Sequence, residues 1–280
     1  MDIKNKILVG NSLEVLKTLP DESVDCIMTS PPYWALRNYG EEGQLGLESS
    51  LFEYVNKLCE IFKEAMRVLK EAGTCWVNIG DTYAGGGSSS LSYDDMRHLP
   101  ENCIPRLINT SESSSGFKNK CLLMIPERFA IQMIENGWIL RNQIIWYKPN
   151  PIPCPVKDRF TVDFEKLFFF VKSKKYNFNQ LTSKDSIRNE RTVWKIHTSN
   201  YRGEHYATYP EELCIKPILA GSPKEGLVLD PFFGSGTTGL VALKNGRNFV
   251  GIELNEKYAQ LARDRLQPYI EQDKLSNYFD

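Results

Sequence analysis

The stretch Leu227-Val228-Leu229-Asp230-Pro231-Phe232-Phe233-Gly234-Ser235-Gly236-Thr237-Thr238-Gly239 decides the fold of this chain. Its apolar start predicts a buried strand, and a glycine-rich turn follows directly. The glycines have the G-x-G-x-x-G spacing, which lets a backbone turn approach a nucleotide-like ligand at a helix N-terminus. The next predicted strand, 248–254, carries Glu253, which is placed to bind the hydroxyls of a ribose. A glycine turn that serves packing alone is the alternative.

Alternating strands and helices are predicted on both sides of the chain's middle. Near the N-terminus, strands at 6–10, 24–29 and 74–79 alternate with helices at 12–19 and 51–70, an order typical of a parallel sheet. Further helices are predicted at 127–136 and 211–220. Strands at 138–146 and 164–171 predict an antiparallel pair at the sheet's edge. We therefore expect an α/β fold with a mostly parallel sheet and one reversed strand.

A second turn at the end of a predicted strand is Thr29-Ser30-Pro31-Pro32-Tyr33-Trp34. Neither proline nitrogen can donate a hydrogen bond, and the residue before each proline is held extended, so backbone carbonyls are left free to accept. With exposed faces of Tyr33 and Trp34 beside it, the turn suits a flat molecule that stacks and donates from an amino group. A nucleobase flipped out of a duplex is such a molecule. A plain turn with two core aromatic residues is the alternative.

Length and composition exclude several classes of protein. With 280 residues, of which 41% are hydrophobic, the chain is long enough for one large domain. No apolar run approaches the ~20 residues of a membrane-spanning helix, and the N-terminus shows no signal-peptide pattern. Seven scattered cysteines without a C-x-x-C pair, and three distant histidines, argue for reduced thiols and against a metal site. We expect a cytoplasmic protein without a metal.

Positive charge is concentrated in one segment. The formal net charge is −1, yet residues 141–202 contain 13 Lys and Arg against 5 Asp and Glu. Aromatic residues interleave with these cations, as on a surface that tracks phosphates. A solvated Lys-rich surface is the alternative. The predicted phosphate contacts are Lys148, Lys157 and Arg159 near the cleft, together with Lys174 and Lys175.

Two segments lack sustained periodicity. Residues 82–120 leave the end of a central strand and contain two Ser/Gly-rich runs, so we favour a mobile lid or a DNA-contacting loop over a spacer. Residues 172–204 are polar and basic. The expected organisation is a catalytic half at 1–171, a target-recognition region at 172–204, and a cofactor-binding half of the same domain at 205–280.

These motifs together resemble those of the DNA amino-methyltransferases that use S-adenosylmethionine. SPPYW at 30–34 comes first, DPFFGSGTTG at 230–239 and VGIEL at 250–254 come last, and the basic segment lies between them. This order is similar to the circularly permuted β group of the family, and the stretches 10–34, 141–159 and 205–222 match it as well. The resemblance implies a class I methyltransferase fold: a Rossmann-like sheet of seven strands with a small target-recognition region.

The resemblance also implies roles for single residues. The cofactor motif of the family matches Asp230, Phe232, Gly234, Gly236 and Thr237, with Glu253 on the ribose. Asn11 stands where the family often has an Asp that contacts the adenine amino group. The catalytic motif matches Ser30, Pro31, Pro32 and Tyr33. Ser30 and a carbonyl near Pro31 would orient the target amino group, and Tyr33 would stack on the flipped base.

The expected reaction follows from Ser30. In this family a Ser before Pro-Pro-Tyr usually accompanies cytosine N4 methylation, and Asp or Asn accompanies adenine N6, so we expect N4-methylation of a flipped cytosine in duplex DNA, with N6-adenine as the alternative. Asn78 or Asp81 could accept a proton or cap a strand end. We interpret Cys154, between prolines, as structural rather than as the nucleophile of carbon-5 methylation.

The resemblance places the chain in restriction-modification. Its expected partners are double-stranded DNA and a cognate restriction endonuclease, and we expect a monomer or a homodimer. A catalytically idle protein that binds S-adenosylmethionine or DNA is the alternative from another class.

Overall fold

The computed structural model describes residues 3–36, 39–85, 115–151, 156–181, 190–198 and 209–276. Most of the expected loop at 82–120, part of the expected recognition region at 172–204, and Cys103 and Cys154 lie outside these residues. Within the described residues, no helix is long and apolar enough to span a membrane. The five described cysteines are free thiols.

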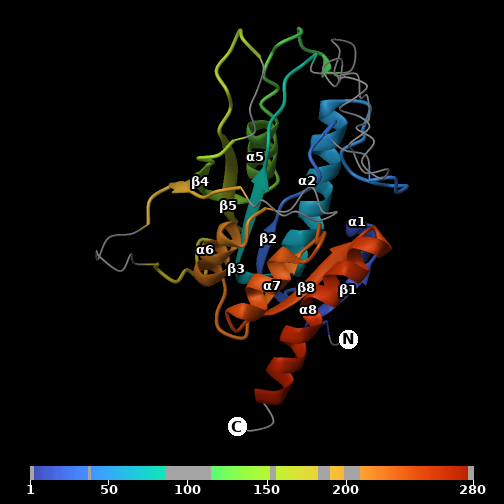
Figure 1. The fold of residues 1–280 in the computed structure, drawn as a ribbon, viewed down its shortest axis with the longest axis vertical. Coiled ribbons are helices and arrows are strands. Elements are labelled where there is room, and N and C mark those ends of the chain that lie inside the picture. Colours follow the sequence, from blue (N-terminus) through green and yellow to red (C-terminus); the bar gives the residue numbers. More distant parts are fainter. Residues whose placement is uncertain are drawn as a thin grey trace.

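An eight-stranded sheet forms the centre of the molecule (Figure 1), in the order β1-β8-β7-β2-β3-β5-β4-β6. In this sheet β5 runs antiparallel to both of its neighbours, and the other pairings are parallel. The predicted α/β class with one reversed strand is therefore confirmed. The strands are β1 (Lys6–Val9), β2 (Val24–Thr29), β3 (Leu69–Ile79), β4 (Ile139–Tyr147), β5 (Phe164–Val171), β6 (Val193–Lys195), β7 (Leu227–Asp230) and β8 (Asn248–Glu253).

The predicted number of seven strands is too low by one. The additional strand, β6, pairs parallel with β4, with Trp146 opposite Trp194. It therefore forms the edge of the sheet where the β4 and β5 pair was expected. Three residues between polar neighbours give no periodic signal, which is why the sequence did not predict it.

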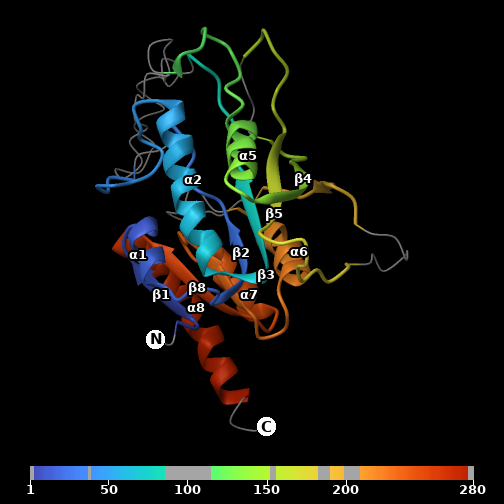
Figure 2. The same cartoon turned by 180° about the vertical axis from the view of Figure 1, so that it is seen from behind.

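Helices cover both faces of the sheet. One face carries α1 (Ser12–Thr18), α2 (Leu51–Val68) and α5 (Ile125–Glu135), which lie in front in Figure 2. The other face carries α6 (Glu211–Gly221), α7 (Thr237–Lys244) and α8 (Glu256–Ser276), which lie in front in Figure 1. Each layer has its own hydrophobic cluster. Phe62 of α2 and Phe129 of α5 belong to the first cluster, and Leu240 of α7 belongs to the second.

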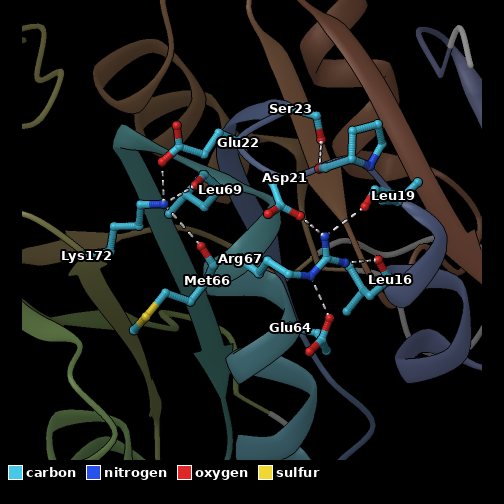
Figure 3. Close-up of polar contacts among 11 residues, drawn as sticks. Leu16, Leu19, Asp21, Glu22, Ser23, Glu64, Met66, Arg67, Leu69 and Lys172 are labelled. Atoms are coloured by element: carbon cyan, nitrogen blue, oxygen red, sulfur yellow. Dashed lines mark hydrogen bonds and ion pairs between the residues drawn. The ribbon is translucent and has the colours of Figure 1, made fainter.

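The amino end of the sheet is braced by two cations (Figure 3). Arg67, in the last turn of α2, donates to the carbonyl oxygens of Leu16 at 2.8 Å and Leu19 at 2.9 Å, where α1 ends. Lys172, just beyond β5, donates to the carbonyl of Leu69 at 2.6 Å. Leu69 is the first residue of β3, which begins five residues earlier than the predicted start at 74. Cations at these positions satisfy carbonyl groups that a helix end leaves without partners.

Candidate active site

The two turns that were predicted to carry the chemistry lie side by side. The parallel neighbours β2 and β7 pair Ile27 with Leu229, so both strands end at the same edge of the sheet. Thr29 Oγ1 donates to Asp230 Oδ1 at 2.6 Å. Because β2 leads into Ser30 and β7 leads into the glycine turn, this buried hydrogen bond joins the two turns directly.

Asp230 anchors the glycine turn. Its side chain is 1% exposed and accepts hydrogen bonds from Phe232 N at 3.0 Å, Thr238 Oγ1 at 2.6 Å and the Tyr209 hydroxyl at 3.0 Å. Burial raises the pKa of this carboxyl group above its ordinary value, and the hydrogen bonds oppose that shift. Both carboxylate oxygens accept hydrogen bonds from the protein, so the role of Asp230 is to hold the glycine turn in shape.

The glycines of the turn meet two different requirements. Gly234 and Gly236 have φ values of +52° and +81°, a left-handed conformation that favours glycine. Gly251 of β8 instead makes room, since a Cβ atom there would lie 2.3 Å from Cγ of Phe233. Gly239 is crowded by the same ring. Part of the glycine pattern therefore serves packing, and the left-handed positions shape the turn ahead of α7.

Glu253 ends β8 beside this turn. Its Oε2 accepts from Gly234 N at 2.7 Å and its Oε1 from Asn255 N at 2.9 Å. A carboxylate offers about four acceptor positions, so further hydrogen bonds can form at both oxygens. Burial raises the pKa of Glu253, and the nearby charge of Asp230 adds to the shift. Among the described residues no cation forms an ion pair with the carboxylate of Asp230 or with that of Glu253.

Asn11 and Thr237 are held by local contacts. Asn11 is the N-cap of α1, where its Oδ1 accepts from Leu13 N at 3.0 Å. The neighbouring Gly10 N donates to the Glu253 carbonyl at 2.9 Å, which brings the start of α1 beside the end of β8. Thr237 is buried, and its hydroxyl accepts from Arg265 Nη1 of α8 at 3.0 Å. The sequence predicted no helix beyond residue 254, so the Arg265 contact was missed.

Ser30 and Tyr33 meet at Asn78. The Ser30 hydroxyl lies 3.4 Å from Asn78 Oδ1 and 3.4 Å from the Tyr33 hydroxyl, and the Tyr33 hydroxyl lies 3.2 Å from Asn78 Oδ1. Asn78 Nδ2 donates to the Lys166 carbonyl at 3.2 Å, which fixes the direction of the amide. A Cβ atom at Gly80 would lie 2.5 Å from the Tyr33 ring, so glycine is needed for the ring to lie there.

Glu165, near the start of β5, was missed by the sequence analysis. Its Oε2 accepts from the Tyr33 hydroxyl at 2.7 Å, and its Oε1 pairs with the Lys148 ammonium. Burial, and then the charge of Glu165, raise the pKa of Tyr33 well above its ordinary value, so the phenol stays protonated and can donate. Lys148 is 18% exposed and lies over the Trp146 ring. The predicted phosphate contact at Lys148 is thus engaged at the Tyr33 turn.

The Ser-Pro-Pro-Tyr turn offers fewer free groups than predicted. The carbonyl of Pro32 accepts from the Tyr54 hydroxyl at 2.9 Å, whereas no donor to the Pro31 carbonyl is found among the described residues. Trp34 is 1% exposed and its Nε1 donates to the Glu48 carbonyl at 3.1 Å. The prediction of an exposed Trp34 face is therefore wrong, because the indole packs in the core and anchors the turn there.

Of the two candidate strand-end residues, Asn78 lies at the site and Asp81 does not contact Ser30. Asp81 Oδ1 accepts from the backbone nitrogens of Thr82 at 2.9 Å and Ile125 at 3.1 Å. Asp81 therefore caps the end of a strand and the start of a helix. Capping a strand end was one of the two roles predicted for it, the other being to accept a proton. Among the described residues there is no group of three metal-ligating side chains.

The remaining predicted cations lie at opposite ends of the sheet. Lys157 and Arg159 belong to the connection between β4 and β5 at the carboxyl end, where the Arg159 guanidinium lies 3.9 Å from the centre of the Tyr83 ring. Lys174 and Lys175 follow Val171, the last residue of β5, which pairs with Thr74 in the middle of β3. At ~3.3 Å per residue, β5 separates them from the site by about 25 Å. The structure does not bring Lys174 and Lys175 to the site.

Comparisons with known proteins identify the class. A family model described as DNA methylase matches residues 24–264, and the chain belongs to this family of N6 and N4 DNA methyltransferases. The chain is 47% identical over 264 residues to the Type II methyltransferase M.Cfr9I of Citrobacter freundii, covering 92% of this chain and 86% of the relative. It is 42% identical to the Type II methyltransferase M.SmaI of Serratia marcescens, covering 93% and 90%.

Solved structures agree on the fold. The PvuII DNA methyltransferase, described as cytosine-N4-specific, superposes with a TM-score of 0.70 at 24% identity, covering 92% of this chain and 85% of that chain. A DNA modification methylase of Thermus thermophilus, solved in complex with S-adenosyl-L-methionine, gives a TM-score of 0.65 at 23% identity, covering 95% and 94%. The protein is thus a DNA methyltransferase of the restriction-modification type with a class I methyltransferase fold, and its cofactor is S-adenosylmethionine.

Proposed function

We propose that the protein transfers a methyl group from S-adenosylmethionine to the exocyclic N4 amino group of a cytosine flipped out of duplex DNA. The observation that carries this proposal is the hydrogen bond between Thr29 and Asp230, at 2.6 Å. It joins a turn suited to a nucleotide-like cofactor to a turn suited to an amino-bearing base. When bound, the cofactor supplies an electrophilic methyl group on a sulfonium.

The charge of the glycine turn supports a cationic cofactor. The carboxylates of Asp230 and Glu253 are held by hydroxyl and backbone N–H donors, and within the described residues neither has a cationic partner. Burial makes both carboxylates costly to ionise alone, as their raised pKa values indicate. A sulfonium and an ammonium nearby would lower that cost. Glu253 would bind the ribose, and Asn11 the adenine end through its side-chain amide.

The base would be held by acceptors at the end of β2. Ser30 Oγ, Asn78 Oδ1 and the carbonyl of Pro31 can accept from the amino group, and the Tyr33 ring can stack on the base. The nitrogen–methyl bond would form as the carbon–sulfur bond breaks, with the demethylated thioether as the leaving group. The three oxygens would orient the amino group, and its proton would pass to water, because a hydroxyl and amide oxygens are too weakly basic to keep it. No covalent enzyme intermediate is needed, so these residues contribute by positioning and by stabilising charge.

Glu165 supports this arrangement from behind. It fixes the Tyr33 hydroxyl, and Lys148 neutralises its charge within the ion pair. The hydrogen bond to Glu165 fixes the orientation of the Tyr33 ring, so the face of the ring stays available for stacking on the base. We therefore assign Glu165 and Lys148 as positioning residues for Tyr33.

Adenine N6 is the second candidate target. Asn78 brings an amide oxygen within 3.4 Å of Ser30 Oγ, and an amide is the acceptor found where the related adenine enzymes have Asn before Pro-Pro-Tyr. The site therefore contains both a hydroxyl and an amide. We favour cytosine because the hydroxyl of Ser30 occupies the motif position itself.

Duplex DNA is the expected macromolecular partner, and a cognate restriction endonuclease and a cytoplasmic location go with it. Lys157 and Arg159 are the phosphate contacts that we retain, because they lie at the carboxyl end of the sheet. Target readout by 172–204 and 82–120 stays a prediction, as does the division into catalytic, recognition and cofactor segments.

The test is to incubate the purified protein with isotopically labelled S-adenosylmethionine and unmethylated plasmid DNA, digest the DNA to nucleosides, and identify the label by mass spectrometry. N4-methylcytosine is the expected product. N6-methyladenine would keep the mechanism and overturn the choice of base. Label in neither base would contradict the proposed function, and the sequence flanking the modified base would define the target site.

A further inference from the structure

Phe160 has an exposure unlike that of any other large apolar side chain in the described residues. Its side chain is 96% exposed, and Val193 comes next at 64%. Burial of a phenylalanine ring stabilises a folded protein, and Phe160 gains almost none of this stabilisation in the free protein. The ring is therefore available to a partner.

The place of Phe160 points to the DNA. It lies in the connection between β4 and β5, which extends beyond the carboxyl end of the sheet (Figure 1), where Tyr33 meets Glu165. Phe160 and Glu165 are five positions apart in the sequence, so their Cα atoms are at most about 17 Å apart. The major groove of B-DNA is about 12 Å wide, and the connection can therefore reach a duplex whose target base is at Tyr33.

The neighbours of Phe160 suit a nucleic acid. Lys157 and Arg159 add positive charge on the same short segment, as phosphate contacts require. The segment is also braced on both sides of the ring. Lys120 pairs with Asp158 at 2.7 Å, and Lys148 N donates to the Asp163 carbonyl at 2.7 Å. An exposed ring on a braced segment that presents two cations is suited to insertion between bases.

We propose that Phe160 is a wedge that enters the DNA stack next to the target base and favours its flipped state. Apolar side chains inserted at a base step partly unstack it, and a base leaves the duplex more readily when its stacking and pairing are already weakened. This inference rests on the proposed function. It assigns Phe160 the role of lowering the cost of base flipping, with no part in the methyl transfer itself.

The test compares two duplexes that contain the target site mapped with the wild-type protein. In one the target base is paired, and in the other its partner is replaced by an abasic site. Phe160→Ala should methylate the paired duplex roughly 10- to 100-fold more slowly than wild type, the range that loss of aromatic–base stacking predicts. On the abasic duplex the two proteins should agree within about threefold, because flipping there no longer requires a wedge.

Controls separate a wedge from other roles. Phe160→Trp keeps a stacking ring and should retain most of the rate, and Ile131→Ala removes another exposed apolar side chain, on α5, and should behave as wild type. Equal rates of wild type and Phe160→Ala on paired DNA would overturn the proposal, and so would a defect that persists on the abasic duplex. A change in oligomeric state of Phe160→Ala by sedimentation would overturn it in favour of docking between two copies of the chain. A wild-type protein that methylates no DNA refutes the proposed function instead.

Discussion

The two ends of the central sheet use charge in opposite ways. At the amino end, Arg67 and Lys172 direct their cations at backbone carbonyls where helices end (Figure 3). At the carboxyl end, Asp230 and Glu253 are buried carboxylates held by neutral donors, and burial raises the pKa of both. The first arrangement pairs its cations with carbonyl oxygens and with the carboxylates of Asp21, Glu22 and Glu64. The second arrangement leaves negative charge that a cationic ligand would stabilise. The amino end of the sheet therefore serves stability, and the carboxyl end serves function.

Apart from loss of the Ser30 hydroxyl, the largest expected effect is at Tyr33. Tyr33→Ala removes the ring that is proposed to stack on the base, and methyl transfer should fall about 100-fold. Tyr33→Phe keeps the ring and loses only the hydroxyl, with its contacts to Glu165, Asn78 and Ser30, so the rate should fall about tenfold. Initial rates at saturating cofactor, with cofactor affinity from calorimetry, check both variants. Equal losses in the two variants would contradict the stacking role.

Glu253 should come next. Glu253→Gln keeps the shape and removes the charge, and the Kd for S-adenosylmethionine should rise roughly 10- to 100-fold, as expected for hydrogen bonds to a charged group. Because burial raises the pKa of Glu253, wild-type affinity should also weaken as pH falls from neutral toward the ordinary carboxyl value of 4.5. Glu253→Gln should show a flatter pH profile. If the pH dependence of cofactor affinity in Glu253→Gln were identical to that of wild type, a group other than Glu253 would be responsible for it.

Without cofactor, the same carboxyl group affects stability with the opposite sign. A raised folded-state pKa means that the folded protein binds a proton more tightly than the unfolded chain does. The free energy of unfolding should therefore decrease as pH rises from 4.5 through the folded-state pKa, and Glu253→Gln should reduce that decrease. Urea titrations across this pH range measure it, and an unchanged slope in the variant would contradict the assignment.

A smaller effect of a different kind is expected at the amino end. Arg67→Met removes the donors to the Leu16 and Leu19 carbonyls and should lower the free energy of unfolding by about 1–3 kcal/mol. Methyl transfer well below the melting temperature should stay within twofold of wild type. Arg67→Lys keeps the charge without the planar fork of the guanidinium, so its free energy of unfolding should lie between those of wild type and Arg67→Met. Loss of activity without loss of stability would break the distinction between the two ends.

The smallest effect concerns salt. Log affinity for DNA falls with log salt in proportion to the number of phosphate contacts, so Lys157→Ala and Arg159→Ala should each reduce the slope by about one. The double variant Lys174→Ala/Lys175→Ala should leave the slope unchanged, because these residues follow the far end of β5. Binding titrations at several salt concentrations test this. A reduced slope in the double variant would extend the DNA surface to the amino end.

Much of this architecture could be predicted from the sequence. Short-range patterns predicted the turns at Ser30 and Gly234 and all strands except β6, since apolar runs and punctuating Gly and Pro are local signals. The side-by-side position of the two turns also followed from the parallel order. The distance of Lys174 and Lys175 from the site also follows from the sequence, because a reversed strand at 164–171 carries the chain away from the site.

The contacts between distant residues could not be predicted. Glu165 is separated from Tyr33 by 132 residues, and a single Glu at the start of an apolar strand gives no sign of its partner. Trp34 was expected to be exposed because it adjoins the motif, but its indole nitrogen finds the Glu48 carbonyl in the core. Burial of an aromatic residue in a turn depends on the residues packed around it, here a cluster that includes residues of α2, and not on the turn itself.

The most direct test of the central claim measures methyl transfer and cofactor affinity on the same sample of Ser30→Ala. The hydroxyl lies at the end of β2, one residue beyond the hydrogen bond that joins the two turns. We predict a Kd for S-adenosylmethionine within twofold of wild type and a rate reduced about 100- to 1000-fold, as for removal of a group that stabilises the transition state. A rate within threefold of wild type would contradict the assignment of the carboxyl end of β2 as the site of methyl transfer.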